Sequence, residues 1–429
     1  MSKAQLTIGF AQLSDCATLV AARERGAFEA HGLDVRLQRF SSWAAMRDAL
    51  GAGTIDAAHM LSPMVVASAA GLGPFPGQFT TAFTLNLNGN AITVSRALYA
   101  EIEEAARETL VRRPLSASAL EPLIAKRLQA GDPPLVFAHV FSHSMHAYEL
   151  RYWLAAGGIN PQKDVRLVVI PPERMVDALS SGQIDGYCVG EPWNNTAVVA
   201  GIGRTLITTG EIWASAPEKV LAVRRTWADE HTETHSALLS ALLETAAWID
   251  RPSHRITAAQ MIASPDYVNV PFDEVVGSLT GKNRQTGGEL RVDMPDFNVF
   301  HRYAANFPWL SHAKWILAQM IRWGDAPDNI DIDVAARAAF QPDFYRKIAG
   351  DLGTACPNKD EKIEGAHSYS WVMNDATSPI AFRPDSFIDG RVFDPSGIEE
   401  YLAGFTIRSE VSRIGQSDQG QALKLVGEP

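Results

Sequence analysis

The fold is decided by residues 178–194, which read ALSSGQIDGYCVGEPWN. Gly182 is typical of a helix end, because glycine adopts left-handed backbone conformations without steric cost. The apolar run Ile184–Val189 predicts a short buried strand, and Gly190-Glu191-Pro192 predicts a turn. A helix, a strand and a turn in this order are typical of the repeating unit of an α/β fold.

The same design occurs earlier in the chain, between Ala49 and Asp56. An offset of 129 residues, which places Asp185 on Asp56, aligns the two copies. The identical pairs are Met46/Met175, Asp48/Asp177, Ala49/Ala178, Leu50/Leu179, Gly53/Gly182, Ile55/Ile184, Asp56/Asp185 and Pro63/Pro192. The agreement is either a coincidence between two ordinary strand–helix–strand units or the trace of two related lobes. We adopt the second hypothesis and expect a cleft between the lobes.

Length and composition describe an ordinary globular protein. A chain of 429 residues suits two lobes with additions, and 46% hydrophobic and 20% charged residues argue against disorder. The net charge of −11 argues against direct nucleic-acid binding but allows a small anion in a locally positive pocket. The three cysteines, Cys16, Cys188 and Cys356, form no CxxC pattern and predict neither a metal site nor a disulfide framework.

The N-terminus leads from Met1 directly into the apolar run Leu6–Phe10, with no signal region or cleavage site. No stretch of about 18 apolar residues occurs, so the sequence predicts no membrane span. If Met1 is the native start, the protein is expected in the cytoplasm. The alternative is a start created by trimming.

The first lobe is expected to alternate strands and helices with short loops. Strands are predicted at 6–10, 33–40 and 55–59, with helices at 17–30 and from Trp43 to about Gly51–Gly53. Such an order predicts a parallel sheet with right-handed crossovers, whose ligands lie beyond the carboxyl ends of the strands. Trp43 lies at one of these ends, either as a ligand contact or as a rim aromatic that packs its own loop.

The second lobe is expected to contain strands at 135–141, 165–170 and 184–189. An extended segment, 83–94, crosses into it through a tight turn at Asn88-Gly89-Asn90, whose amides either form the turn or face the cleft. We therefore predict lobe 1 in residues 1–88 and lobe 2 in 89–212. Residues 213–429 are predicted to return to lobe 1 and to end in a helical, wrapping segment.

Two further positions are candidates for anion binding. His146 follows a serine-rich turn at a helix start, where free backbone N–H groups suit a small anion, although a capping histidine is equally consistent. Lys219 precedes the strand-like run Val220–Val223, where it is either solvated or functional. Because Lys219 can supply the charge, we expect His146 to be neutral and to add no pH dependence between about pH 6 and 8.

Catalytic motifs are missing from the sequence. It contains no GxSxG, HExxH, Walker loop or GxGxxG after a strand. We therefore predict no catalytic residues, no metal and no cofactor, and a protein that is not an enzyme.

Five segments of the chain resemble the nitrate/bicarbonate-binding proteins of ABC transporters. They are residues 42–48, 85–89, 151–159, 189–194 and 387–395, in the same order as in that family. The resemblance implies an α/β, two-lobed periplasmic-binding-protein-like fold, a type II-like C-clamp in which each lobe is a mainly parallel sheet flanked by helices. It further implies that the lobes close on one oxyanion through Trp43, Asn90, His146, Gly190 and Lys219. Asn90 is a departure, since the transport receptors resemble this chain with glutamine there. Lys219 within Pro217-Glu218-Lys219 favours nitrate or nitrite over bicarbonate.

The missing export signal and lipid-anchoring cysteine are a second departure from the transport receptors. In this respect the chain resembles cytoplasmic nitrate/nitrite sensors of the NasS type. In that family the sensor holds an RNA-binding antitermination regulator (NasT-like, ANTAR) inactive until nitrate arrives, so a sensor function is expected here. The alternatives are a nitrate receptor of an ABC transporter whose signal was removed, or an enzyme related to the pyrimidine synthases, whose cysteine-rich motif is missing.

Overall fold

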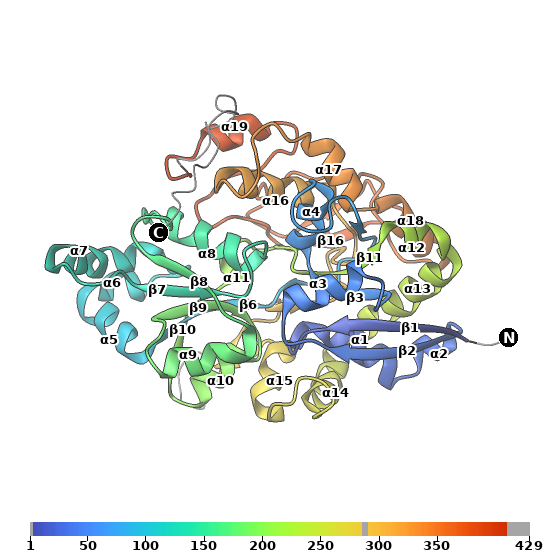
Figure 1. Ribbon diagram of the computed structural model, residues 1–429, viewed down its shortest axis with the longest axis horizontal. Coiled ribbons are helices and arrows are strands. Elements are labelled where there is room, and N and C mark those ends of the chain that lie inside the picture. The colour runs from blue at the N-terminus through green and yellow to red at the C-terminus, as the bar shows by residue number, and fades with distance from the viewer. Residues whose placement is uncertain (1–2, 285–290, 410–429) are drawn as a thin grey trace, which may run out of the picture.

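Two α/β lobes lie side by side in the computed structural model, which describes residues 3–284 and 291–409 (Figure 1). The first sheet has the strand order β2-β1-β3-β11-β4 and the second has the order β10-β6-β9-β7-β8. The first sheet consists of β1 (Ala4–Phe10), β2 (Leu33–Arg39), β3 (Ala57–Leu61), β4 (Phe79–Thr80) and β11 (Lys219–Arg224). The second consists of β6 (Asn90–Ser95), β7 (Val136–His139), β8 (Arg166–Val169), β9 (Gly186–Gly190) and β10 (Gly203–Thr208). The two-lobed fold class predicted from the sequence is confirmed.

Each sheet contains one strand that runs antiparallel to the others, β11 in the first sheet and β6 in the second. β1 pairs in parallel with β2 and β3, whereas β11 runs antiparallel to β3. In the same way β7 pairs in parallel with β8 and β9, and β6 runs antiparallel to β9. The chain therefore crosses between the lobes twice, before β6 and before β11. The last residues of the predicted third segment, 410–429, lie outside the described residues.

The 129-residue offset is present in the structure as well as in the sequence. The bounds of β3 shifted by this offset are those of β9, and the bounds of β6 shifted in the same way are those of β11. A side-chain hydrogen bond is repeated too. The backbone N–H of Thr7 donates to Asp56 Oδ2 at 2.8 Å, and that of Val136 donates to Asp185 Oδ2 at 2.7 Å. These are equivalent residues, so the two identical aspartates close the same turn in each lobe.

Serine caps begin the two helices that carry predicted site residues. α3 (Trp43–Gly51) follows Ser42, whose Oγ accepts from the Ala45 N–H at 3.3 Å. α8 (Met145–Ala156) follows Ser144, whose Oγ accepts from the Ala147 N–H at 3.1 Å. Such caps satisfy backbone donors that the first helical turn leaves unpaired.

The helix predicted over 17–30 is interrupted, which corrects the sequence expectation. It forms α1 (Ala17–Glu24) and α2 (Ala27–Ala30), because Gly26 adopts a φ of 71° between them. The strand predicted at 55–59 begins later, as β3, because Asp56 is engaged in closing the turn before it.

The remaining helices cover the sheets and extend the first lobe (Figure 1). They are α4 (Ser62–Ala69), α5 (Arg96–Ala105), α6 (Arg107–Leu110), α7 (Glu121–Ala130), α9 (Met175–Ser180), α10 (Trp193–Val199), α11 (Thr209–Ile212), α12 (Arg225–Glu230), α13 (Thr232–Ile249), α14 (Pro252–Ala263), α15 (Phe272–Thr280), α16 (Leu310–Arg322), α17 (Ile332–Ala339), α18 (Pro342–Asp351) and α19 (Ile398–Ala403). Short strand pairs join β5 (Leu87–Asn88) to β14 (Asn298–Val299), β12 (Lys282–Arg284) to β13 (Arg291–Asp293) and β15 (Trp371–Met373) to β16 (Ile380–Phe382). Among the described residues, no helix combines the length and the apolar character that crossing a membrane requires.

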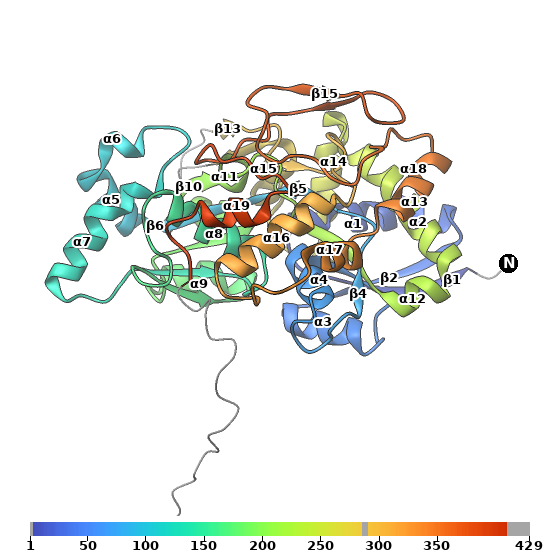
Figure 2. The same cartoon turned by 90° about the horizontal axis from the view of Figure 1, so that it is seen from above.

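The C-terminal segment from α16 to α19 lies across both lobes (Figure 2). The apolar stripe of α16 is buried core, as its spacing predicts, and Trp315 packs against Trp213 with ring centroids 4.6 Å apart. Two polar contacts tie the segment to α8. Arg151 Nη1 lies 2.6 Å from Asp325 Oδ2, and Tyr152 Oη donates to Asp389 Oδ1 at 2.8 Å. The segment therefore anchors the helix that carries His146.

Candidate anion site

The five predicted contacts meet where the two lobes touch. Each lies in the first turn of a helix or at the first or last residue of a strand, on the side that faces the other lobe. The five are Trp43 at the first residue of α3, Asn90 at the first of β6, His146 at the second of α8, Gly190 at the last of β9 and Lys219 at the first of β11. All five are buried, and the side chains of His146 and Lys219 are 0% exposed.

Contacts within this group connect the two lobes. Lys219 Nζ lies 5.6 Å from the centroid of the Trp43 ring, a distance that suits a cation–π contact. Asn90 pairs with Gly190 across the second sheet. His146 Nδ1 is 3.5 Å from Oε1 of Glu218, the residue that precedes Lys219. The structure therefore brings all five positions into one cluster.

Asn90 and Lys219 occupy equivalent positions under the 129-residue offset. Each begins the antiparallel strand of its sheet. Asn90 lies opposite Gly190, and Lys219 lies opposite Leu61 at the matching place in the first sheet. The two lobes thus present corresponding strand starts to one another, one carrying a neutral amide and the other a cation.

Carboxylates in this cluster were not predicted from the sequence. Lys219 Nζ donates to Asp15 Oδ2 at 2.8 Å and to Glu218 Oε1 at 2.5 Å. Asp15 Oδ1 in turn lies 3.0 Å from His59 Nε2. Glu149, fully buried on α8, faces Glu218 and Asn90. Of these carboxylates, only Glu149 could have been predicted from the sequence to lie near the site, because it follows His146 by three residues and therefore lies on the same helix face.

Burial and charge together fix the protonation of these groups. Burial alone would lower the pKa of Lys219, but Asp15 and Glu218 outweigh it and raise that pKa above its usual value. Burial would raise the pKa of Asp15, but Lys219 and His59 bring it below its usual range. Burial lowers the pKa of His146 well below its usual value, and Lys219 adds to this effect. Lys219 and Asp15 are therefore charged and His146 is neutral.

Several buried polar atoms of the cluster have no hydrogen-bond partner among the described residues. They are Nδ2 and Oδ1 of Asn90, Nε1 of Trp43, both ring nitrogens of His146, and both carboxyl oxygens of Glu149. A buried donor without a partner costs about 1–3 kcal/mol, so native proteins rarely keep one unless a ligand or water satisfies it. N–H donors from both lobes, grouped around one lysine, suit a small oxyanion.

The lobes are closed over the cluster. The Ser14 N–H donates to the Glu191 carbonyl at 2.7 Å, and Trp193 Nε1 donates to the Gln12 carbonyl at 3.1 Å. A ligand therefore reaches the cluster only when the lobes separate.

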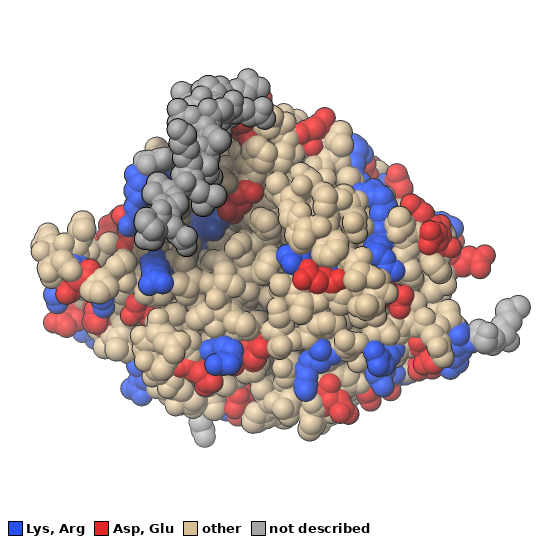
Figure 3. Space-filling view, in the orientation of Figure 1, with Lys and Arg blue, Asp and Glu red and all other residues tan. Residues whose placement is uncertain are grey.

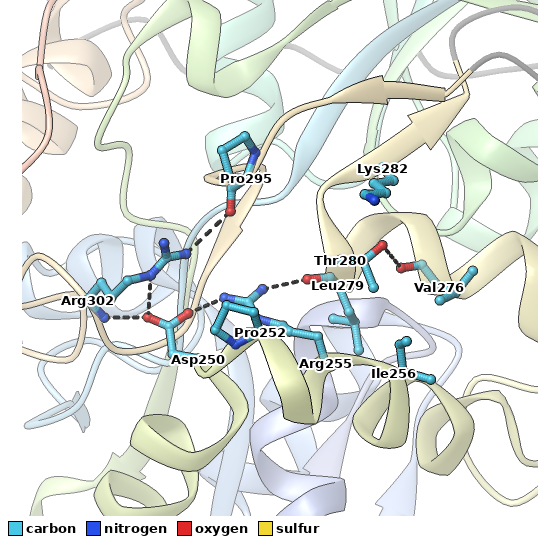
Figure 4. Close-up of a pocket in the computed structure, with 10 residues that line it drawn as sticks. All are labelled: Asp250, Pro252, Arg255, Ile256, Val276, Leu279, Thr280, Lys282, Pro295 and Arg302. Atoms are coloured by element: carbon cyan, nitrogen blue, oxygen red, sulfur yellow. Dashed lines mark hydrogen bonds and ion pairs between the residues drawn. The ribbon is translucent and has the colours of Figure 1, made fainter.

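Other features of the molecule are less suited to an anion. Acidic and basic side chains are interspersed on the face shown in Figure 3, so that no broad positive field covers it. A larger cavity, about 460 Å³, lies beside Asp250, Arg255 and Arg302 (Figure 4). Its arginines are engaged with Asp250 and with backbone carbonyls, including that of Leu279, which Arg255 reaches at 2.7 Å. This second arrangement is a structural ion network.

Replacing Gly190 by leucine is expected to weaken the binding of an anion to this cluster. A Cβ at Gly190 would lie 3.2 Å from Asn90 Oδ1 and 3.3 Å from Leu13 Cδ2 of the other lobe. The larger side chain must therefore displace Asn90 and hold the lobes apart, at about 1–3 kcal/mol or roughly 5- to 150-fold in affinity. Isothermal titration with nitrate measures the loss. Gly190→Ala should lose less, and a Gly190→Leu variant that binds like the parent would contradict this placement of the site.

Two α/β lobes of matching topology that close over a small polar cluster define a substrate-binding protein of the periplasmic type. Residues 1–263 match the NMT1-like family model. The crystal structure of the periplasmic nitrate-binding protein NrtA from Synechocystis PCC 6803 is similar with a TM-score of 0.81 and 27% identity, covering 94% of this chain and 99% of that one.

Curated relatives agree with this class. The nitrate/nitrite binding protein NrtA of Synechococcus elongatus is 32% identical over 415 residues, which are 94% of this chain and 86% of the relative. The nitrate import ATP-binding protein NrtC of Synechocystis sp. is 35% identical over an alignment of 430 positions, which covers 98% of this chain but 58% of the relative. The chain therefore belongs to the NMT1-like family and to the nitrate/bicarbonate substrate-binding proteins of ABC transporters.

Proposed function

We propose that this chain binds nitrate, or the related anion nitrite, between its two lobes. The observation that carries the proposal is the buried cluster itself. It contains one charged lysine from the first lobe and unpartnered N–H donors from both lobes, at Trp43, Asn90 and His146. The names of the relatives, nitrate/nitrite binding protein and nitrate-binding protein, support this choice of anion.

The chemistry of nitrate fits these donors. Nitrate is planar, singly charged and weakly hydrated, so a few donors in a water-free site can replace its hydration. In this proposal Lys219 supplies the charge, Asn90 and His146 donate N–H groups, and Trp43 adds an apolar wall and its indole N–H. The backbone next to Gly190 approaches the anion closely because no side chain intervenes. An anion that contacts both lobes stabilises only their closed arrangement.

Titration calorimetry with four anions tests the proposal. Nitrate or nitrite should bind, whereas sulfate should bind much more weakly because its second charge adds to the negative charge that the carboxylates already place around the single lysine. Bicarbonate should also bind more weakly. If bicarbonate or sulfate binds best, or if none of the four binds, the anion assignment is wrong.

The closing of the lobes would serve one of two purposes. The relatives favour a receptor subunit that delivers nitrate to an ABC transporter, and the NrtA neighbour is a periplasmic protein. The sequence resemblance instead favours a cytoplasmic sensor that holds an antitermination regulator of the ANTAR class. That hypothesis stays a prediction.

A mixture of this chain with an ANTAR antitermination regulator distinguishes the two purposes. A sensor should form a complex with the regulator without nitrate and release it when nitrate is added. The coupling between the two ligands would be about 1–3 kcal/mol, or roughly 5- to 150-fold, and reciprocal. Size-exclusion chromatography with and without nitrate measures this, and Lys219→Ala, which should not release the regulator, is the control. A complex that is indifferent to nitrate, or no complex, favours the receptor.

A further inference from the structure

The Glu218 carboxylate lies between two of the proposed anion contacts. Its Oε1 is 2.5 Å from Lys219 Nζ, on the first lobe, and 3.5 Å from His146 Nδ1, on the second. Its Oε2 is buried and has no hydrogen-bond partner among the described residues. A carboxylate is itself a planar oxyanion with delocalised charge, as nitrate is. Glu218 therefore accepts a hydrogen bond from Lys219 in the way that the bound anion is proposed to accept it.

The groups that face Glu218 do not balance its negative charge. The charged and titratable neighbours come from four elements, and the Asn90 amide comes from a fifth. They are Lys219 on β11, Asp15 on the turn before α1, His146 and Glu149 on α8, and Cys188 on β9. Asp15 alone balances Lys219, and His146 is neutral. An anion that enters this buried site would add a second surplus negative charge to that of Glu218. Like charges a few ångströms apart in a buried site strongly disfavour ionisation of both.

We propose that Glu218 is an internal competitor of the anion, which leaves Lys219 when the anion binds and takes up one proton from the solvent as it does so. The proposal rests on the anion function above and adds a specific linkage to pH. The proton adds to one carboxylate oxygen of Glu218, and no other covalent bond changes. Protonated Glu218 then carries an O–H that can donate to the bound anion in place of a like charge that would repel it.

The state of the neighbouring carboxyl groups assigns the proton to Glu218. Burial raises the pKa of Glu149 well above its usual value, which favours the protonated form of Glu149 before the anion arrives. Asp15 is held ionised by Lys219 and His59. Burial also raises the pKa of Glu218, though Lys219 opposes this. When the anion replaces Glu218 beside Lys219, that opposing effect is lost and the pKa of Glu218 rises further.

The sign of the pH dependence follows from this uptake. If the complex holds one proton more than the free protein, affinity falls by up to about tenfold for each pH unit above the pKa of Glu218 in the free protein. Below that pKa, Glu218 is protonated before the anion arrives and affinity is constant. Neutral His146 contributes nothing to the slope.

Calorimetry of the full chain with nitrate at pH 8 tests the proposal. The titration is performed in HEPES and in Tris, whose ionisation enthalpies differ, so that the difference in observed heat counts the protons taken up. We expect about one proton per nitrate, and an affinity that falls by up to about tenfold between pH 7 and 8. Glu218→Gln should reduce the uptake to near zero and bind nitrate at least about tenfold more tightly than the parent at pH 8.

Glu191→Gln is the matched control, because burial raises the pKa of Glu191 to about 7 and makes it a second carboxyl group able to take up a proton in this pH range, while its Oε2 accepts from the Asn195 N–H rather than from Lys219. It should retain the proton uptake of the parent. Nitrate binding by the parent with no difference between buffers, or loss of uptake in Glu191→Gln while Glu218→Gln retains it, would overturn the assignment. Proton uptake by the parent is measured without any variant, so the proposal can be tested even if Glu218→Gln folds poorly. A parent chain that binds no nitrate contradicts the proposed function instead.

Discussion

Lys219→Ala is expected to lower the affinity for nitrate by about 30- to 1000-fold, which corresponds to roughly 2–4 kcal/mol. Lys219 supplies the positive charge of the cluster. Its side chain is fully buried and contacts Asp15 and Glu218. Its removal leaves the incoming anion with neutral donors only. Isothermal titration at pH 7 measures the loss directly.

The same substitution also affects stability, so a second variant is needed as a control. Without Lys219, Asp15 and Glu218 remain buried without their cation, and breaking a buried ion pair costs about 3–5 kcal/mol. Lys219→Ala combined with Glu218→Gln removes one of the two stranded charges. It should recover part of the melting temperature, while its nitrate affinity stays well below that of the parent. If Lys219→Ala binds nitrate as well as the parent, the site has been placed wrongly.

Asp250→Ala is expected to lower the free energy of unfolding by about 3–5 kcal/mol. Asp250 ends α13 and holds Arg255, which is itself buried, together with Arg302 and the loop before it (Figure 4). Asp250 Oδ2 accepts from the Arg302 N–H at 2.6 Å and from the His301 N–H at 3.2 Å. Alanine would leave the Arg255 guanidinium without its counter-ion in a buried position. Chemical denaturation of parent and variant measures the difference.

The pH dependence of this network has a definite sign. Burial would raise the pKa of Asp250, but Arg255 and Arg302 outweigh it and hold the pKa below its usual value. The contribution of Asp250 is therefore complete at neutral pH, begins to fall near the unfolded pKa of about 3.9, and is lost as the pH drops through the lower folded value. Asp250→Asn keeps an acceptor and should lose less than Asp250→Ala. An unchanged stability in Asp250→Ala, or an altered nitrate affinity of the folded variant, would contradict a purely structural role.

Local patterns predicted the strands and the lobe-forming repeat because these depend on short-range chemistry. Asp56 accepts from β1 and Asp185 accepts from β7, the equivalent strand of the other lobe, so the sequence repeat and the structural repeat have the same origin. The break at Gly26 was missed because glycine within an apolar helical pattern does not itself reveal a left-handed backbone. Strand bounds shifted where a side chain such as Asp56 closed the preceding turn.

The site could be predicted only in part, because its contacts are remote in the sequence. Trp43, His146 and Lys219 lie at helix starts or strand ends, which local patterns identify as ligand-facing positions. Asp15, which accepts a hydrogen bond from Lys219, could not be identified from a local pattern. It is separated from Lys219 by 204 residues and looks locally like one of a pair of helix-capping residues. The sequence therefore predicted residues that the structure brings into one cluster, but not the carboxylates that lie among them.

The insertion of β11 into the first sheet also bears on how the protein is synthesised. All strands of the second sheet lie within residues 90–208, whereas β11, at Lys219–Arg224, lies between β3 and β4 of the first sheet. The ribosome therefore synthesises the complete second sheet before β11, the strand that connects β4 to the rest of the first sheet. Domains whose strands are contiguous can fold as they emerge. We expect the second lobe to mature first during translation, with the N-terminal lobe completed only when Lys219 and its strand have left the ribosome.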